Sequence, residues 1–234
     1  RKYNGYSFPF EEIAKELYRI IKEGGVLVWV VGDSTINGTE SLTSFKQAIY
    51  FTEQCGFNLH DTMIYHKETL PLSHNRYEQW FEYMFVFSKG KPKTFNGLRQ
   101  KSNHFGITKN GPVNCASIGE AGSKMGGKKG KKIKIQEHKL RGNIWKYNVG
   151  AGQTTSDMIA FQHSAIFPDA LAKEHIYTWS NESELIYDCF SGSGTMAKMA
   201  HLQKRNWIAS EISKEYCELS EKRLAPYLAQ TQLF

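Results

Sequence analysis

The stretch Asp188-Cys189-Phe190-Ser191-Gly192-Ser193-Gly194-Thr195 decides the fold that we expect for this chain. It follows the apolar run Leu185-Ile186-Tyr187, which predicts a buried strand, and it precedes residues Met196 to Leu202, which predict a helix. A tight glycine turn between a strand and a helix is typical of a nucleotide-type site at the carboxyl end of a sheet. Glycines let the backbone approach a ligand, and the helix N-terminus offers N–H groups that bind it. The stretch therefore predicts an α/β fold with a ligand site at this turn.

An acidic residue follows the next predicted strand. The apolar run Trp207-Ile208-Ala209 ends at Ser210-Glu211, and the Glu211 carboxylate can accept hydrogen bonds from both hydroxyls of a ribose. The glycine turn alone would also fit a tight connection without a ligand, but an acid at the neighbouring strand end favours a ligand. A dinucleotide oxidoreductase is the rival. Its Gly-x-Gly-x-x-Gly fingerprint is not met, because Ala197 stands where the third glycine should be.

The composition limits the class of protein. The chain has 234 residues, enough for one α/β domain with an insertion, and 40% hydrophobic and 13% aromatic residues suit a globular protein. The formal net charge of +7 suits a polyanionic partner. The 4 cysteines form no Cys-x-x-Cys motif, so we expect no metal site, no disulfide framework and reduced thiols. No apolar run could span a membrane and no signal peptide is visible, which predicts a cytoplasmic protein without a membrane partner.

The first part of the chain predicts alternating helices and strands. Glu11 to Ile21 has the apolar spacing of a helix, and Val26 to Val31 is a continuous apolar run that predicts a central strand buried on both faces. A second helix and two consecutive strands follow at Ser44 to Gly56, Phe57 to His66 and Tyr83 to Phe87. This order predicts a mostly parallel sheet with an antiparallel hairpin at its edge.

A segment rich in lysine and glycine interrupts this pattern from Lys89 to roughly Lys146. Such a run is either a solvated loop or a loop that contacts phosphates, and its place inside an α/β domain favours a function. Beyond it, Ser156 to Ser180 predicts a helical region interrupted by Pro168, and Ser213 to Leu228 predicts the last helix.

The glycine turn resembles the cofactor motif of the permuted, β-type amino-group DNA methyltransferases, which reads Asp-Pro-Phe-x-Gly-Ser-Gly-Thr. In this chain Cys189 replaces the proline. The resemblance implies that Glu211 binds the ribose of the cofactor. It also implies that the segment from His163 to Leu171 flanks the methionine part of the cofactor. The proline that usually follows the histidine is absent, so we rely on Phe167 and Pro168 there and treat His163 as an ordinary polar residue. The implied cofactor-binding residues are Asp188, Phe190, Gly192, Ser193, Gly194, Thr195, Glu211, Phe167 and Pro168.

The resemblance implies a three-layer, Rossmann-like α/β methyltransferase fold with a basic recognition insertion. Residues 1–90 would form the catalytic half, 91–150 the target-recognition insertion and 151–234 the cofactor-binding half. Proteins of this family transfer a methyl group from S-adenosylmethionine to N4 of cytosine or N6 of adenine, in a base flipped out of double-stranded DNA. The resemblance further implies a bacterial or phage-type cytoplasmic enzyme, and it is compatible with a homodimer.

The catalytic signature of that family, Asp, Asn or Ser followed by Pro-Pro and an aromatic residue, is missing, because no two of the 6 prolines are adjacent. We expect it just upstream of Arg1, and a naturally inactive paralogue is the alternative. Asp33, Ser34 and Tyr65 are further active-site candidates because they lie near predicted strand ends, although Tyr65 would equally suit packing. The target base, the recognition sequence and any partner nuclease stay open.

Contacts with DNA are expected from basic and amide side chains, since lysine mostly contacts phosphate while Asn and His can also contact base edges. The candidates are Arg76, Lys101, His104, Lys109, Asn110, Lys128, Lys129 and Arg141. Two alternatives remain at this point: a methyltransferase of RNA or a small molecule, and a DNA-binding remnant without activity. The intact glycine turn together with Glu211 argues against a remnant.

Overall fold

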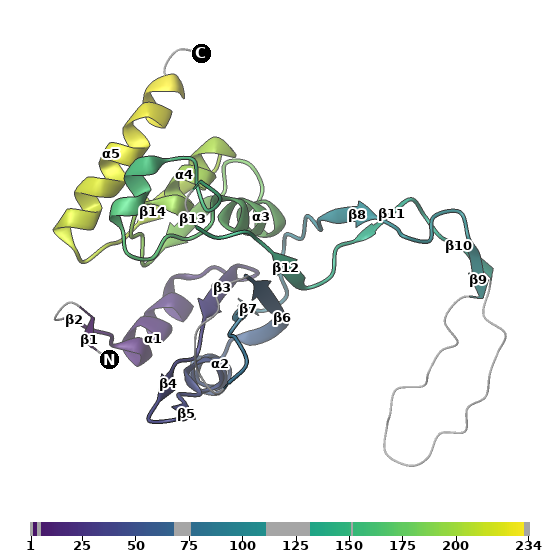
Figure 1. Ribbon diagram of the computed structural model, residues 1–234, viewed down its shortest axis with the longest axis horizontal. Helices are drawn as coiled ribbons and strands as arrows, with labels where there is room; N and C mark the ends of the chain where they lie inside the picture. Colours follow the sequence, from purple (N-terminus) through teal and green to yellow (C-terminus); the bar gives the residue numbers. More distant parts are fainter. Residues whose placement is uncertain (1, 4–5, 68–75, 111–131, 151, 232–234) are drawn as a thin grey trace. The chain divides into compact units, whose positions relative to one another are not determined.

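The structure, a computed structural model, describes residues 2–3, 6–67, 76–110, 132–150 and 152–231 (Figure 1). The chain forms two compact units, of which the first comprises residues 1–96 and 143–234 and the second residues 97–142. Within the described residues, no helix combines the length and the apolar character that crossing a membrane requires.

The first unit contains a four-stranded sheet in the order β12 (Ile144–Lys146), β6 (Asn58–His66), β7 (Phe81–Ser88), β3 (Val26–Val31). β7 is antiparallel to both β6 and β3, whereas β12 is parallel to β6. Three strands therefore share one direction, and β7 runs against them. A bulge between Leu59 and Asp61 shifts the register of the β6–β7 pair.

The predicted hairpin is present as β6 and β7, but it does not form the edge of this sheet. The three residues of β12 return after the second unit and cover the free side of β6, a pairing that strand order along the sequence does not reveal. β3, which we expected in the centre of a sheet, lies at one end of these four strands, and its burial is mostly intermediate.

Helices cover both faces of this sheet. On one face, α1 (Phe10–Ile20) and α2 (Thr43–Glu53) pack Leu17 and Phe51 against Phe85 and Phe87 of β7 in one hydrophobic cluster. Side chains alternate across a strand, so Met84 points to the opposite face. There Met84 Sδ lies 3.2 Å from His175 Nε2 of α3 (Asp169–Trp179). The three layers that we expected are therefore present.

The last part of the first unit carries the paired strands β13 (Leu185–Asp188) and β14 (Asn206–Ala209), which are parallel. The helix α4 (Thr195–Leu202) connects them, and α5 (Lys214–Thr231) follows. The predicted helical region before β13 becomes a short 3₁₀ helix, η1 (Met158–Gln162), and α3, with Pro168 as the N-cap of α3. Ala172 and Ile176 of α3 pack on Met199 and Ala200 of α4, which joins the two helices.

The second unit consists of two short antiparallel ribbons. β8 (Arg99–Lys101) pairs with β11 (His138–Leu140), and β9 (Thr108–Asn110) pairs with β10 (Lys132–Lys134). The two residues of the first unit that border the second unit are both asparagines, and each is hydrogen-bonded within the first unit. Asn96 Nδ2 donates to Tyr177 O at 3.0 Å, and Asn143 Nδ2 donates to Thr62 O at 3.0 Å. Two further ribbons of two-residue strands, β1 (Lys2–Tyr3) with β2 (Tyr6–Ser7) and β4 (Thr35–Ile36) with β5 (Thr39–Glu40), belong to the first unit.

Candidate functional site

The predicted glycine turn and the predicted acid meet at the carboxyl ends of β13 and β14. The register of this parallel pair places Asp188 opposite Ala209. Two backbone hydrogen bonds continue the pairing beyond the strands: Ser210 N donates to Asp188 O at 2.8 Å and Ser191 N donates to Ser210 O at 3.0 Å. The turn and the segment that leads to Glu211 are thus held side by side.

Both glycines of the turn have a conformation that other residues rarely adopt. Gly192 has a φ of +50° and Gly194 a φ of +78°. A Cβ atom at Gly194 would lie 2.9 Å from Ser220 Cβ on α5, and one at Gly192 would lie 2.9 Å from His163 Nε2. The backbone angle therefore favours glycine at both positions, and at Gly194 the close approach of α5 requires it a second time.

The Glu211 carboxylate ties the turn to the start of α5. Its Oε2 accepts from Gly192 N at 2.8 Å, and its Oε1 accepts from Ile212 N and Ser213 N at 2.9 Å each. A carboxylate oxygen has two lone-pair sites, so Oε2 keeps the capacity to accept one more hydrogen bond. The side chain is held in place by the backbone and can still bind a hydroxyl.

Asp188 and Cys189 line the start of the turn. Burial raises the pKa of the Asp188 carboxyl, and the negative charge of Glu211 acts in the same direction, while a hydrogen bond from Phe190 N at 3.0 Å opposes them. Burial, with the charge of Asp188, raises the pKa of the Cys189 thiol to about 12. A thiol with so high a pKa stays protonated at neutral pH, and the side chain is small enough to stand where the family motif has proline.

Phe190 reaches the first half of the unit. Its ring centroid lies 5.9 Å from that of Trp29 on β3 and 5.6 Å from that of Phe8, while 48% of the residue stays exposed. Ring pairs at these distances are attractive. The turn is thereby connected to the strand that precedes Asp33.

The segment before α3 also meets the turn. Thr195 Oγ1 donates to Phe167 O at 3.5 Å. The ring of His163 contacts that of Tyr216 of α5, with centroids 4.2 Å apart and planes tilted by 51°, and its Nδ1 accepts from Ala165 N at 3.1 Å. The structure thus places His163 directly against Gly192, a closer relation than we expected from the sequence.

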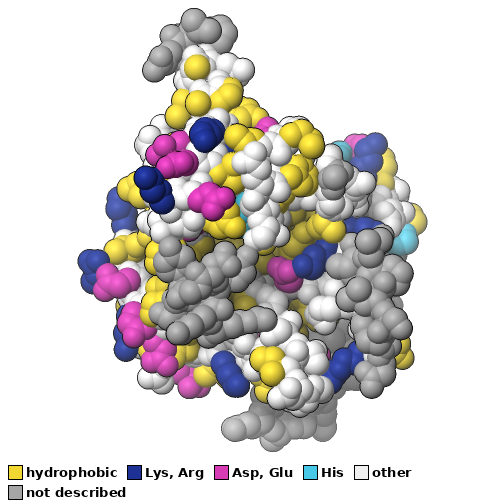
Figure 2. All heavy atoms as spheres, turned by 60° about the vertical axis from the view of Figure 1, so that its left-hand side comes forward, with side chains coloured by type: hydrophobic (Ala, Val, Ile, Leu, Met, Phe, Trp, Pro, Cys, Tyr) yellow, Lys and Arg dark blue, Asp and Glu magenta, His cyan; other side chains and the backbone are white. Residues whose placement is uncertain are grey.

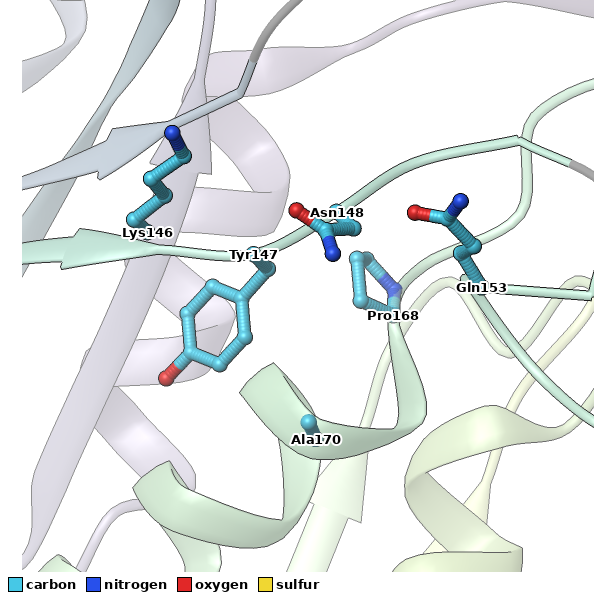
Figure 3. A pocket seen from close by; sticks show the side chains of 6 residues that line it. All are labelled: Lys146, Tyr147, Asn148, Gln153, Pro168 and Ala170. Carbon is cyan, nitrogen blue, oxygen red and sulfur yellow. The ribbon is translucent and has the colours of Figure 1, made fainter.

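A pocket of about 310 Å³ lies between the end of β12 and the start of α3. In Figure 3 the amide side chains of Asn148 and Gln153 flank Pro168 at this pocket. Pro168 lines this pocket and is also the N-cap of α3. It directly follows Phe167, whose carbonyl oxygen contacts the turn.

A buried ion cluster lies behind the turn, and the sequence did not predict it. We call it the Arg223 network: Arg223 of α5, Lys198 of α4, Asp157 and Asp169. Lys198 Nζ donates to Asp157 Oδ2 and to Asp169 Oδ2 at 2.7 Å each, and the Arg223 side chain is 0% exposed. Burial alone would raise the pKa of Asp157, but hydrogen bonds from Lys198, Tyr227 and Arg223 lower it to about 2.

The candidate catalytic residues have structural partners. Asp33 Oδ1 accepts from Ser44 N at 3.1 Å and from Ser41 Oγ at 2.9 Å, and Asp33 Oδ2 accepts from Ser44 Oγ, so this carboxylate caps the start of α2. Ser34 N donates to Ser41 Oγ at 3.3 Å. Tyr65 is buried, its ring lies 6.0 Å from that of Tyr147, and burial raises its pKa to about 12. The geometry of Asp33 and Tyr65 is that of capping and packing.

The expected DNA-contacting residues are divided between the units. In the second unit, Lys101 and His104 are exposed, Arg141 is half-buried, and Lys109 and Asn110 belong to β9. Lys128 and Lys129 lie outside the described residues. Arg76, in the first unit, lies 4.0 Å from Glu40 and donates to Gly38 O. On the face of the molecule in Figure 2, acidic and basic side chains are interspersed and form no single basic patch among the described atoms.

A sheet covered by helices on both faces, together with a parallel strand pair that has a glycine turn and an acid at its neighbouring strand ends, defines a Rossmann-like class of protein. The chain belongs to the amino-group DNA methylase family, whose model matches residues 1–222 with the description "DNA methylase". It is 53% identical over 232 residues to the orphan methyltransferase M.BamHII of Bacillus amyloliquefaciens, covering 97% of this chain and 85% of that protein. It is 26% identical over 223 residues to the type II methyltransferase M.MjaI of Methanocaldococcus jannaschii, covering 90% of this chain and 64% of that one.

Solved structures confirm the Rossmann-like α/β fold. The PvuII DNA methyltransferase (cytosine-N4-specific) matches with a TM-score of 0.66 and 19% identity, covering 92% of this chain and 68% of that chain. The M1.HpyAVI–SAM complex matches with a TM-score of 0.60 and 22% identity, covering 92% of this chain and 81% of that chain. The family model and the relative that is 53% identical confirm the family that the cofactor motif suggested.

Proposed function

We propose that this DNA methyltransferase transfers a methyl group from S-adenosylmethionine to N4 of cytosine or N6 of adenine, in a base flipped out of double-stranded DNA. The observation that carries the proposal is the Glu211 carboxylate, which binds Gly192 N at 2.8 Å and keeps a lone pair beside the turn. Family membership and the solved complex of a relative with SAM support the choice of cofactor.

The residues around the turn fit this cofactor. Glu211 would accept the ribose hydroxyls, and the positive φ angles of Gly192 and Gly194 give the turn the shape on which the cofactor would lie. Asp188, Phe190, Ser193 and Thr195 of the turn, with Phe167 and Pro168 from the neighbouring segment, would complete the site. When bound, the cofactor supplies an electrophilic methyl group on a sulfonium.

The protein contributes positioning and electrostatics. The lone pair of an exocyclic amine is delocalised into the base, so the amine is a poor nucleophile until an acceptor binds its hydrogens. We assign this task to the catalytic half, residues 1–90, and cofactor binding to residues 151–234. Asp33 remains a candidate there, although its oxygens already accept three hydrogen bonds from Ser41 and Ser44.

The recognition segment, residues 91–150, would contact DNA. The described part of the second unit contains seven Lys and Arg residues and one Glu. A two-stranded ribbon fits the major groove of B-DNA, and lysines along it would contact phosphates. The proposed contacts are Lys101, His104, Lys109, Asn110, Lys128, Lys129 and Arg141, together with Arg76 of the first unit. A homodimer stays a prediction.

Cofactor binding is the first test, because the chain contains no Pro-Pro-aromatic signature whose variant could be assayed for turnover. We would titrate the protein calorimetrically with S-adenosylmethionine and compare Glu211→Gln with Glu218→Gln, an exposed acid on α5 whose ion pair with Lys214 is 3.8 Å long. Loss of a charge-assisted acceptor should weaken binding by about 1–3 kcal/mol for Glu211→Gln only. Equal affinities of the wild type and both variants would refute the assigned site.

Duplex DNA should then bind with an affinity that falls as salt rises, because bound phosphates release counterions. Duplex RNA and single nucleosides serve as competitors. Stronger competition by RNA than by DNA of the same sequence would favour an RNA substrate instead.

A further inference from the structure

Arg223 contacts the cofactor turn from α5, a helix that comes after the turn and Glu211 in the sequence. Its Nη1 donates to Ser193 O at 3.1 Å, to Ser193 Oγ at 3.2 Å and to Thr195 Oγ1 at 2.9 Å. Ser193 and Thr195 stand on either side of Gly194, whose backbone has the left-handed conformation. One guanidinium nitrogen therefore holds both residues that flank this left-handed glycine.

The other two nitrogens of the same guanidinium are fixed from the opposite side. Nε donates to Asp157 Oδ2 at 2.8 Å, and Nη2 donates to Asp169 Oδ1 at 2.9 Å and to Thr155 Oγ1 at 3.1 Å. All three nitrogens of a planar, fully buried group thus have partners. Such a group has one orientation, because any rotation would break several charge-assisted hydrogen bonds at once.

The charges of the network cancel. Arg223 and Lys198 oppose Asp157 and Asp169, so the four side chains have no net charge when all are ionised. A neutral cluster cannot attract the carboxylate of an amino-acid-like ligand from a distance. Its effect on ligand binding must therefore be geometric and act through the backbone that it holds.

We propose that Arg223 is a positioning residue for the S-adenosylmethionine site, which makes α5 a structural part of that site. The hydrogen bond to Ser193 O fixes the peptide plane between Ser193 and Gly194. The bond to Thr195 Oγ1 fixes the first residue of α4, at the helix end whose N–H groups have no acceptor within the helix. Glu211 holds the same turn through Gly192 N, so the two residues fix it at both ends. This inference rests on the proposed function.

The test uses Arg223→Lys, which keeps the charge and loses the planar fork. The matched control is Arg205→Lys. Arg205 also donates to backbone and hydroxyl oxygens, with Nε to Ser180 Oγ at 3.1 Å and Nη2 to Ser180 O at 2.8 Å, but those acceptors lie at the end of α3. Both variants should lower the urea midpoint. Calorimetric titration of the folded proteins with S-adenosylmethionine should show roughly tenfold weaker binding for Arg223→Lys, the scale of one or two hydrogen bonds, and less than about twofold for Arg205→Lys.

A double-mutant cycle with Glu211→Gln gives a readout that a merely structural arginine would not move. If both residues hold one turn, the fold-loss of affinity in the double variant, Arg223→Lys with Glu211→Gln, should differ clearly from the product of the fold-losses in the two single variants. Should Arg223→Lys fail to fold, Tyr227→Phe replaces it. Tyr227 OH donates to Asp157 Oδ1 at 2.6 Å, outside the turn, and its removal should weaken binding by roughly threefold.

The outcomes separate the two proposals. One outcome is that the wild type binds S-adenosylmethionine, that Glu211→Gln weakens this binding, and that Arg223→Lys (or Tyr227→Phe in its place) leaves the affinity unchanged. This outcome would overturn the positioning role and leave the proposed function standing. No binding by the wild type, or binding that is indifferent to Glu211, would overturn the proposed cofactor site and this inference with it.

Discussion

Replacing Gly194 by alanine should lower the free energy of unfolding by about 2–5 kcal/mol. The backbone at Gly194 has φ +78° and ψ +24°, and holding an L-residue in that conformation costs roughly 1–2 kcal/mol. The new Cβ would also lie 2.9 Å from Ser220 Cβ, closer than real contacts, and overpacking of this kind costs about 1–3 kcal/mol. The sum is measured as the shift in urea unfolding at constant pH.

Two variants separate the contributions. Gly38 has nearly the same angle, φ +77°, with no described atom within 4 Å of a Cβ placed there, so Gly38→Ala should cost only roughly 1–2 kcal/mol. In a Ser220→Gly background the nearest remaining atom is the Cα of residue 220 at 3.5 Å, an ordinary contact, and Gly194→Ala should cost no more than Gly38→Ala. If Gly194→Ala proves as mild as Gly38→Ala in the native background, the packing argument for this glycine is wrong.

Three further predictions concern single side chains. The pKa of Asp157, lowered to about 2 against an ordinary 3.8, should stabilise the protein by about 2 kcal/mol at neutral pH. This contribution is present above pH 4 and is lost as the pH falls towards 2. In Asp157→Asn it should vanish from the pH dependence of the free energy of unfolding. Asp33→Asn should destabilise by about 1 kcal/mol through the weakened cap on α2, and Ser44→Ala should show a loss of the same order in denaturant unfolding. Cys189, with its thiol pKa raised to about 12, should react with iodoacetamide at pH 8 only after addition of denaturant; labelling as fast as in the unfolded chain would contradict its burial.

The elements closest to the cofactor turn could be predicted because their signals are local. Val26–Val31 forms a strand with the predicted bounds, and the run before Asp188, the glycines and the helix after them appear in the predicted order. The predicted burial of that run was wrong, because Leu185 and Tyr187 are exposed. Each depends on a few neighbouring residues: an apolar run, a pair of glycines, a helix start. The position of Glu211 beside the turn followed from the rule that parallel strands end at one edge.

The contacts that sequence reasoning missed are long-range. The partners of Arg223 lie up to 68 residues away, and the run Glu221-Lys222-Arg223 looks like an ordinary solvated helix face. One signal was available: Arg223 follows the buried Leu219 by one helical turn and therefore shares its face. The pairing of β12 with β6 carried no such signal, because three residues after a long insertion show no period.

The late arrival of β12 has a consequence for how the chain folds during synthesis. β6 and β7 can form their hairpin as soon as Ser88 has emerged, but the other side of β6 receives its partner only at Ile144, after the whole second unit. Until then the nascent sheet exposes a row of unpaired backbone groups, which is a template for association with other chains. Rapid pairing of this edge of β6 depends on bringing Asn143 back to Thr62. A longer insertion would slow this pairing only weakly, since the entropy cost of loop closure grows with the logarithm of loop length. The fold therefore tolerates recognition segments of different lengths, at the expense of a period during translation in which one strand edge stands open.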